Sequence, residues 1–311
     1  MPTNSLGSRR RDYALPMASP PTPSGGASGS PGREARREDG FLRLVVFFSA
    51  LGGFFKILGG LVYGSRAALV DALTSIVNLI AALLVYRYEG LSALPPDKDH
   101  HYGHDRMFIG GSMFSVVLYS VVGGAMTVDL IDSVVASYRV HVYAALFATI
   151  GAIPYLTAIM ISKGAGGSYG TYAKFTVVEL VECVVVVLAA FGGALVSYLI
   201  DFTGALILLS YLYVEIARET KAILSIVTDR VPRNLDHIVD SMEEASRRLE
   251  VEIRSFRIRE VAPGRYHGDV VMAVPAGTSV EDAHKMAHRL EQTLKNLVGE
   301  EVDLVIHIEP E

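Results

Sequence analysis

The chain has 311 residues, is 50% hydrophobic and carries a formal net charge of −5 at pH 7. This negative balance gives no basis for nucleic-acid binding, and the single cysteine, Cys183, excludes a disulfide framework. Charged residues are sparse from 44 to 216 and dense from 221 to 311, which indicates a membrane domain followed by a small soluble domain.

The first 39 residues are rich in Ser, Gly, Pro and Arg and show no apolar periodicity. This composition is typical of a disordered tail. It does not fit a signal peptide, because no apolar core closely follows the first Arg cluster. We therefore expect a tail at 1–39, a transport domain at 40–220 and a cytoplasmic domain at 221–311.

Six apolar runs follow, most of them near the roughly 20 residues that a helix needs to cross a bilayer. We expect spans at 44–63, 67–86, 107–130, 140–161, 173–200 and 203–216, the last of which is short and could begin at Asp201. Lys and Arg gather on the side that also holds the tail, and only Arg66 and Arg139 fall on the other side. The positive-inside rule then puts both termini in the cytoplasm, and we expect the cell membrane as the location.

The last 90 residues or so predict the order helix, strand, strand, helix, strand. The ranges are 234–249, 251–261, 266–274, 278–297 and 302–308. Pro263 and Gly264 provide the turn between the first two strands. The fold class is therefore an α-helical membrane domain with six transmembrane helices, plus a C-terminal cytoplasmic α+β domain.

Ionisable side chains inside the spans are the strongest indication of function, because each costs about 2.5–3.5 kcal/mol at mid-bilayer. The second span carries oxygen donors on one face, and the fifth span carries two acids three residues apart. The candidates are Asp71, Thr74, Ser75 and Asn78 on the second span and Glu179 and Glu182 on the fifth. Oxygen ligands suit Mg²⁺, Mn²⁺ or Fe²⁺ and make zinc less certain. The alternative is that these groups form polar contacts between helices or are protonated acids.

Lys56 in the first span has two interpretations. A lysine there can snorkel to the membrane surface as a structural residue, which we expect, or it can be the counter-ion of a carboxylate.

The loop after the second span contains Asp97, His100 and His104. Two imidazoles and a carboxylate are a common ligand set for zinc and other transition metals. His101 and Asp99 are spare donors, and Gly103 allows a tight turn. We expect a metal site in this loop.

In the C-terminal domain, His307 and Glu309 share one face of the last strand, and His284 and His288 share one face of a helix. These side chains are weaker metal-ligand candidates. Each histidine could equally be an ordinary surface residue.

Residues 95–104, with Pro95, Pro96, Asp97, His100, Tyr102, Gly103 and His104, resemble the P-P-D-x-x-H-x-Y-G-H signature of the cation diffusion facilitator family of divalent metal/proton exchangers. The resemblance covers about residues 44–311. It implies six spans, a metallochaperone-like αββαβ domain, a homodimer in the lipid bilayer, and metal ligands at His284, His307 and Glu309. Arg254 and Val271 stand at two further ligand positions and cannot serve, so we expect that site to be incomplete.

Members of this family carry a His/Asp-x-x-x-Asp pair on the second span and another on the fifth. Two alignments of the second span remain open, one giving Asp71 and Ser75 and the other Thr74 and Asn78. On the fifth span the pair falls on Phe175 and Glu179. At least one ligand is therefore replaced on each helix.

The predicted function is efflux of a divalent metal ion such as Mn, Fe or Zn by proton antiport and alternating access. The alternative is a non-transporting relative that acts as a partner subunit or metal-responsive scaffold. We expect no enzyme, because the sequence contains neither a nucleophile–base set nor a phosphate-binding loop.

Overall fold

A computed structural model gives the fold of residues 47–311 except 49, 166–168, 233–234, 263 and 299–300. The side chains of 155, 158–165, 169–179 and 301 also lie outside the description. The expected tail at 1–39 and the start of the first span fall in the part that is not described.

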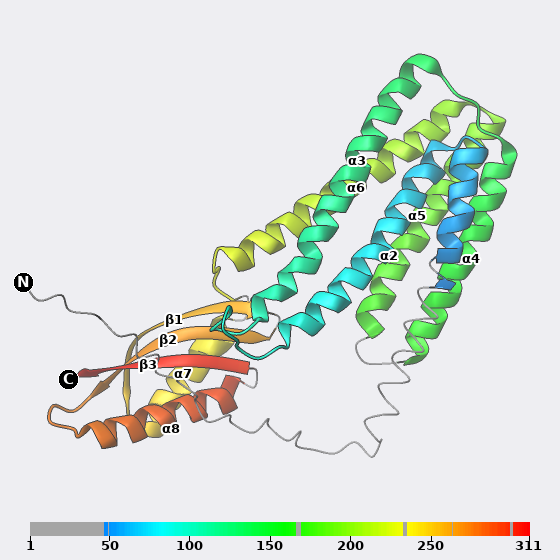
Figure 1. The fold of residues 1–311 in the computed structure, drawn as a ribbon. Coiled ribbons are helices and arrows are strands. Elements are labelled where there is room, and N and C mark those ends of the chain that lie inside the picture. The colour runs from blue at the N-terminus through cyan, green and yellow to red at the C-terminus, as the bar shows by residue number, and fades with distance from the viewer. Residues whose placement is uncertain (1–46, 49, 166–168, 233–234, 263, 299–300) are drawn as a thin grey trace, which may run out of the picture. The chain divides into compact units, whose positions relative to one another are not determined.

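Among the residues that the structure describes, the membrane part consists of helices and the loops that join them (Figure 1). Its first described helical segment, Ala50–Val62, ends in a π-helical turn, η1 (Leu58–Val62). The elements that follow are α2 (Arg66–Ser92), η2 (Asp105–Met107), α3 (Phe108–Ala136), α4 (Val142–Ala165), α5 (Tyr169–Leu195) and α6 (Tyr198–Val227).

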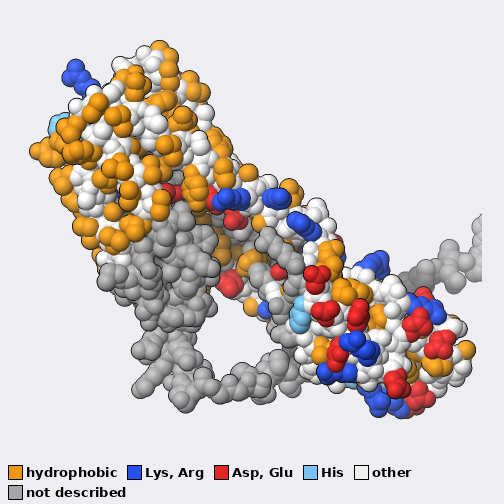
Figure 2. All heavy atoms as spheres, turned by 180° about the vertical axis from the view of Figure 1, so that it is seen from behind, with side chains coloured by type: hydrophobic (Ala, Val, Ile, Leu, Met, Phe, Trp, Pro, Cys, Tyr) orange, Lys and Arg blue, Asp and Glu red, His pale blue; other side chains and the backbone are white. Residues whose placement is uncertain are grey.

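Apolar helical segments occur at all six expected places. Among the described residues, α2, Asp105–Ala136 and α6 are long and apolar enough to cross a membrane. Ala50–Val62, Val142–Pro154 and Leu180–Leu195 are apolar over shorter described lengths. Figure 2 shows hydrophobic side chains over the outer surface of the helices and charged side chains over the C-terminal domain. Such an apolar exterior suits contact with lipid.

Helix α2 packs against α3, α5 and α6. Its Ala67, Ala68 and Val70 are completely buried. Gly60 lets the first segment approach α2 closely, because a Cβ there would lie 2.8 Å from the backbone of Leu69. The side chains of α2 are thus surrounded by other helices along one face.

The boundary between the last two spans differs from the prediction. Helix α5 ends at Leu195 rather than 200, and α6 begins at Tyr198 and runs to Val227 instead of spanning 203–216. The turn is missed because the residues on both sides of it are apolar. The signal is Ser197, whose hydroxyl accepts a hydrogen bond from the Leu199 N–H and caps α6.

The C-terminal domain confirms the predicted order. It consists of α7 (Leu235–Leu249), β1 (Glu252–Ala262), β2 (Arg265–Val274), α8 (Val280–Val298) and β3 (Glu301–Pro310). The sheet order is β1-β2-β3, with β1 and β2 antiparallel and β2 and β3 parallel.

Both helices of this domain cover the same face of the sheet (Figure 1). The core between the two layers contains Met242 of α7, Leu290 and Leu294 of α8, and Val270 and Met272 of β2. Burial of these apolar side chains holds the helices and the sheet together. The ligand candidates His284 and His307 are exposed and lie outside this core.

Candidate metal sites

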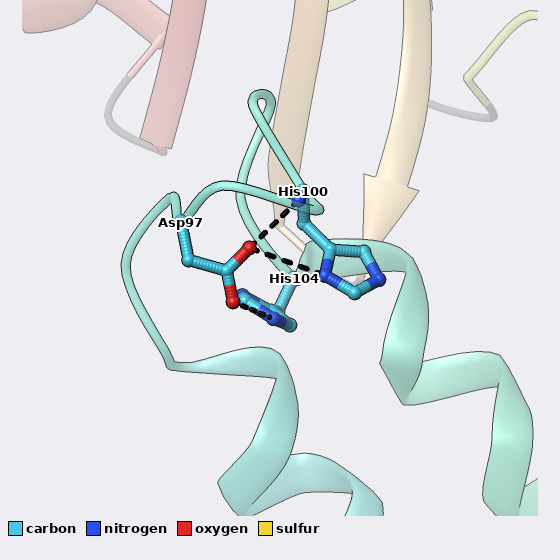
Figure 3. Close-up of side chains that lie close together, drawn as sticks. All are labelled: Asp97, His100 and His104. Atoms are coloured by element: carbon cyan, nitrogen blue, oxygen red, sulfur yellow. Dashed lines mark hydrogen bonds and ion pairs between the residues drawn. The ribbon is translucent and has the colours of Figure 1, made fainter.

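The loop between α2 and α3 brings three ligand candidates together (Figure 3). The two carboxylate oxygens of Asp97 face one imidazole each: Oδ1 lies 3.4 Å from His100 Nδ1, and Oδ2 lies 3.3 Å from His104 Nε2. One ligand atom from each residue lies within 4.8 Å of the other two. The geometry is compact enough for one ion to bridge all three.

Local hydrogen bonds explain this arrangement. Asp97 Oδ1 accepts the backbone N–H groups of His100, at 2.7 Å, and of Asp99, at 2.9 Å. These bonds, that of His100 foremost, hold the pKa of the Asp97 carboxyl below its ordinary value of 3.8. Gly103 has φ +82°, a conformation that other residues rarely adopt.

His104 is oriented from its other ring nitrogen. The Nδ1–H donates to the carbonyl oxygen of Pro95 at 3.2 Å, which leaves Nε2 as the acceptor or ligand atom. The ring is buried, whereas His100 is exposed. His101 is exposed and lies outside the group, and Asp99 contributes only its backbone N–H.

In the membrane domain, Asp71 is only 1% exposed and Ser75 is 4% exposed. Both bind the ammonium group of Lys56: Nζ lies 3.0 Å from Asp71 Oδ1 and 3.1 Å from Ser75 Oγ. The expectation that Lys56 snorkels to the surface is wrong, because its side chain is completely buried and serves as the counter-ion of the carboxylate. The sequence signal for this ion pair was Lys56 itself, because it is a single charged residue within an apolar segment.

The other two ligand candidates on this helix make hydrogen bonds to different partners. The Thr74 hydroxyl donates to the backbone carbonyl of Asp71 at 3.0 Å, within its own helix. Asn78 accepts a hydrogen bond from the hydroxyl of Tyr119 on α3. Asp71 and Ser75, the pair of one alignment, thus share Lys56 as a partner, and the choice between the two alignments stays a prediction.

The fifth-span candidates are described only in part. The side chains of Glu179 and Phe175 lie outside the described residues. Glu182 is half-buried and interacts electrostatically with Tyr211 of α6. Helix α5, which carries both acids, packs against α2.

The C-terminal candidates do not form a ligand group. His307 Nε2 lies 3.6 Å from Glu309 Oε1, but Arg254 Nη1 approaches Glu309 Oε2 more closely, at 3.1 Å. His284 is exposed and stacks on His288. Within the described residues, Asp97, His100 and His104 are the one group of three or more ligands close enough for an ion.

Asp201 is a buried acid that the sequence suggested only as a helix boundary. It accepts hydrogen bonds from the Ser65 hydroxyl and from the backbone N–H of Arg66. These bonds hold together the N-terminal ends of α2 and α6. The signal that could have found this contact is an acid four residues after the capping Ser197, in the first turn of α6.

Two family models match the chain. The cation efflux transmembrane domain matches residues 42–226, more than half of the chain, and the cation efflux protein cytoplasmic domain matches residues 233–311. The manganese efflux system protein MneP of Bacillus subtilis is 23% identical over 271 residues, covering 82% of this chain and 90% of its own length. MneS of the same organism is 22% identical over 83% of this chain and 90% of its own length.

A shorter match is to the magnetosome protein MamM of Magnetospirillum gryphiswaldense, 34% identical over 77 residues, 25% of this chain and 24% of that protein. The two domain matches occur in the order expected from the helical part and the αββαβ part. The match to the transmembrane domain covers both the apolar helices and the loop that carries Asp97, His100 and His104. The chain therefore belongs to the cation diffusion facilitator family, as an integral membrane protein for divalent metal efflux.

Proposed function

We propose that this protein exports Mn²⁺, or a divalent ion with similar ligand preferences such as Fe²⁺, in exchange for protons. It works as a homodimer by alternating access. It spans the cell membrane, and both of its termini lie in the cytoplasm. Zinc is the less favoured cargo, because no histidine or cysteine replaces the missing ligands of the second span.

The observation that carries this proposal is the carboxylate of Asp71. It is buried inside the helical membrane domain, and its Oδ2 has no hydrogen-bond partner among the described residues. An unsatisfied buried carboxylate oxygen is costly, and a divalent cation would remove that cost. The names of MneP and MneS, as manganese efflux proteins, support the same cargo.

We assign the remaining ligands to the oxygen donors that the sequence predicts on the second and fifth spans. Ser75 adds a hydroxyl oxygen, Glu179 and Glu182 add carboxylates from the fifth span, and Thr74 and Asn78 support the site through contacts of α2. Carboxylates that release the ion when they take up protons would couple the two fluxes. A second ion would bind in the loop at Asp97, His100 and His104.

Reconstituted vesicles with a pH gradient test this proposal. We expect uptake of Mn²⁺ by the native chain to exceed that of an Asp71→Ala, Glu179→Ala double variant by at least about tenfold, the loss typical of removing charged ligands. Parallel measurements with Mg²⁺, Fe²⁺, Co²⁺, Ni²⁺ and Zn²⁺ identify the cargo. Equal fluxes from the two proteins would end the proposal.

The second candidate function is a non-transporting partner subunit or metal-responsive scaffold. The observation in its favour is that Lys56 already binds Asp71 and Ser75. This function predicts metal binding that is abolished by His100→Ala with His104→Ala, together with no flux of any of the six metals. Such a pair of results would replace the transport proposal.

A further inference from the structure

The ammonium group of Lys56 is buried inside the membrane domain and is bound there by side chains of α2. It binds Asp71 Oδ1 at 3.0 Å and Ser75 Oγ at 3.1 Å, and the side chains of Lys56 and Asp71 are both completely buried. The methylene stem passes Gly151 of α4, where a Cβ would lie 3.2 Å from Lys56 Cγ. Glycine at this position therefore leaves room for the lysine.

This placement differs from that of a lysine with a purely structural role in a membrane span. Such a residue directs its charge to the aqueous boundary. Here the charge stays within the protein and donates hydrogen bonds to a carboxylate and a hydroxyl oxygen, which are also the kinds of atom that bind hard metal ions. The other carboxylate oxygen, Asp71 Oδ2, is buried and has no hydrogen-bond partner among the described residues.

We propose that Lys56 is a tethered cation of the membrane metal site. While the site holds no metal, its ammonium neutralises Asp71 and occupies Ser75. A divalent ion first binds at Asp71 Oδ2 and takes the remaining oxygens only when the ammonium moves away. This inference rests on the proposed function in one respect: it takes Asp71 to be a ligand of the transported ion.

The tether gives Lys56 a role in selectivity. Coulomb attraction to a carboxylate grows in proportion to the charge of the cation. A divalent ion therefore competes with the single charge of the ammonium, whereas K⁺ or Na⁺ brings no more charge than the lysine and is not covalently attached. Lys56 would lower the affinity for every cation but reject monovalent ions most strongly.

The test measures Mn²⁺ binding to the full-length protein in detergent by calorimetry. Every protein carries His100→Ala and His104→Ala, so that the loop does not contribute. Lys56→Met removes the charge at similar length, and Lys56→Gln removes it while keeping a hydrogen-bond donor. Lys221→Met, at an exposed position of α6, is the matched control.

We expect both Lys56 variants to bind Mn²⁺ at least tenfold more tightly than their parent and the Lys221 control. We also expect 100-fold excess K⁺ to weaken Mn²⁺ binding in the Lys56 variants and to have no effect in the parent. Thermal unfolding and gel filtration establish that each variant is folded. The glutamine variant decides the outcome if the methionine variant is not folded.

Unchanged or weaker Mn²⁺ affinity in the folded Lys56 variants would overturn the proposal that Lys56 is a tethered cation. Failure of both variants to fold would overturn it as well, because the ammonium would then be a structural requirement rather than a replaceable ligand. The transport proposal is judged separately: tighter binding by the variants without flux in the native chain would keep the tether and reject transport. Native flux with unchanged variant affinity would do the reverse.

Discussion

The hydroxyl of Ser65 donates a hydrogen bond to the carboxylate of Asp201 at 2.5 Å, although 136 residues separate the two. Ser65 caps α2, and its hydroxyl also accepts the Ala68 N–H. Asp201 in addition accepts the backbone N–H of Arg66 at 2.7 Å and the hydroxyl of Tyr138 at 3.0 Å. One buried acid thus joins α2, α6 and the segment after α3.

Because Asp201 satisfies three donors, its removal should act on stability. We expect Asp201→Ala to lower the free energy of unfolding by about 2–4 kcal/mol, since the hydroxyls of Ser65 and Tyr138 lose a charged acceptor. Thermal unfolding in detergent measures this change. Asp132→Ala, at an exposed position of α3, serves as the control and should change stability by less than about 0.5 kcal/mol. Similar losses for both variants would contradict a structural role specific to Asp201.

The loop site predicts an order among three neighbouring histidines. His104→Ala and His100→Ala should each weaken binding of Zn²⁺ or Mn²⁺ to the loop about 10- to 100-fold, because each removes one of three grouped ligands. His101→Ala should leave the affinity within about twofold, since that exposed ring lies outside the group. Calorimetry on the full-length protein, with Lys56 unchanged, measures the metal affinity of all three histidine variants. An equal loss with His101→Ala would show that the ligand set differs from this one.

The lowered pKa of Asp97 gives a prediction about pH. Its N–H donors from His100 and Asp99 stabilise the ionised form, so the carboxyl of the folded protein titrates below the ordinary value of 3.8. The ionised group stabilises the loop at pH values above 3.8, and this contribution is lost only as the pH falls through the lower, folded pKa. Asp97 is therefore an anionic ligand at both pH 7.5 and pH 5.5.

It follows that Asp97→Asn should weaken metal binding by the same factor at pH 7.5 and at pH 5.5. Titrations of the native and variant proteins at the two pH values give the ratio of their affinities. Binding itself can change with pH, and the ratio should not. A ratio that approaches one at pH 5.5 would mean that Asp97 is already protonated there.

The membrane fold follows well from the sequence because the bilayer imposes a simple constraint on helix length. Runs of about 20 apolar residues located all six helical segments, and strand alternation located β1 to β3 within two residues. The turn at 196–197 was missed, because apolar residues continue on both sides of its single polar residue, Ser197. Hydrophobicity marks a span and says little about where one span ends and the next begins.

The sites were predictable to the extent that their residues are close in sequence. Asp97, His100 and His104 lie within one short loop, and the structure groups them as the spacing suggested. The partner of Asp71 was not predictable in this way, because Lys56 lies on another helix and the choice between surface and counter-ion depends on packing. The same limit applies to Asp201 and Ser65, because four helices, α2 to α5, separate these two residues in the sequence.

The C-terminal domain offers a gain-of-function test of the ligand position at Arg254. Its guanidinium lies 3.1 Å from Glu309, whose carboxylate also lies 3.6 Å from His307. An arginine cannot bind a metal ion, and its charge competes with one for Glu309. Replacing it by histidine removes that charge and adds a nitrogen ligand beside the two that are present.

We therefore expect Arg254→His to create a zinc site in a full-length protein that also carries His100→Ala and His104→Ala. The gain should be at least tenfold in Zn²⁺ affinity by calorimetry, because three ligands replace two and the competing cation is gone. Arg257→His, on the same strand and paired with Asp269 at 3.1 Å, is the matched control and should add no such site. A gain with Arg257→His, or none with Arg254→His, would mean that Glu309 and His307 are not held as a ligand pair. The outcome thus separates a cation site blocked by one arginine from a surface on which these residues meet only by chance.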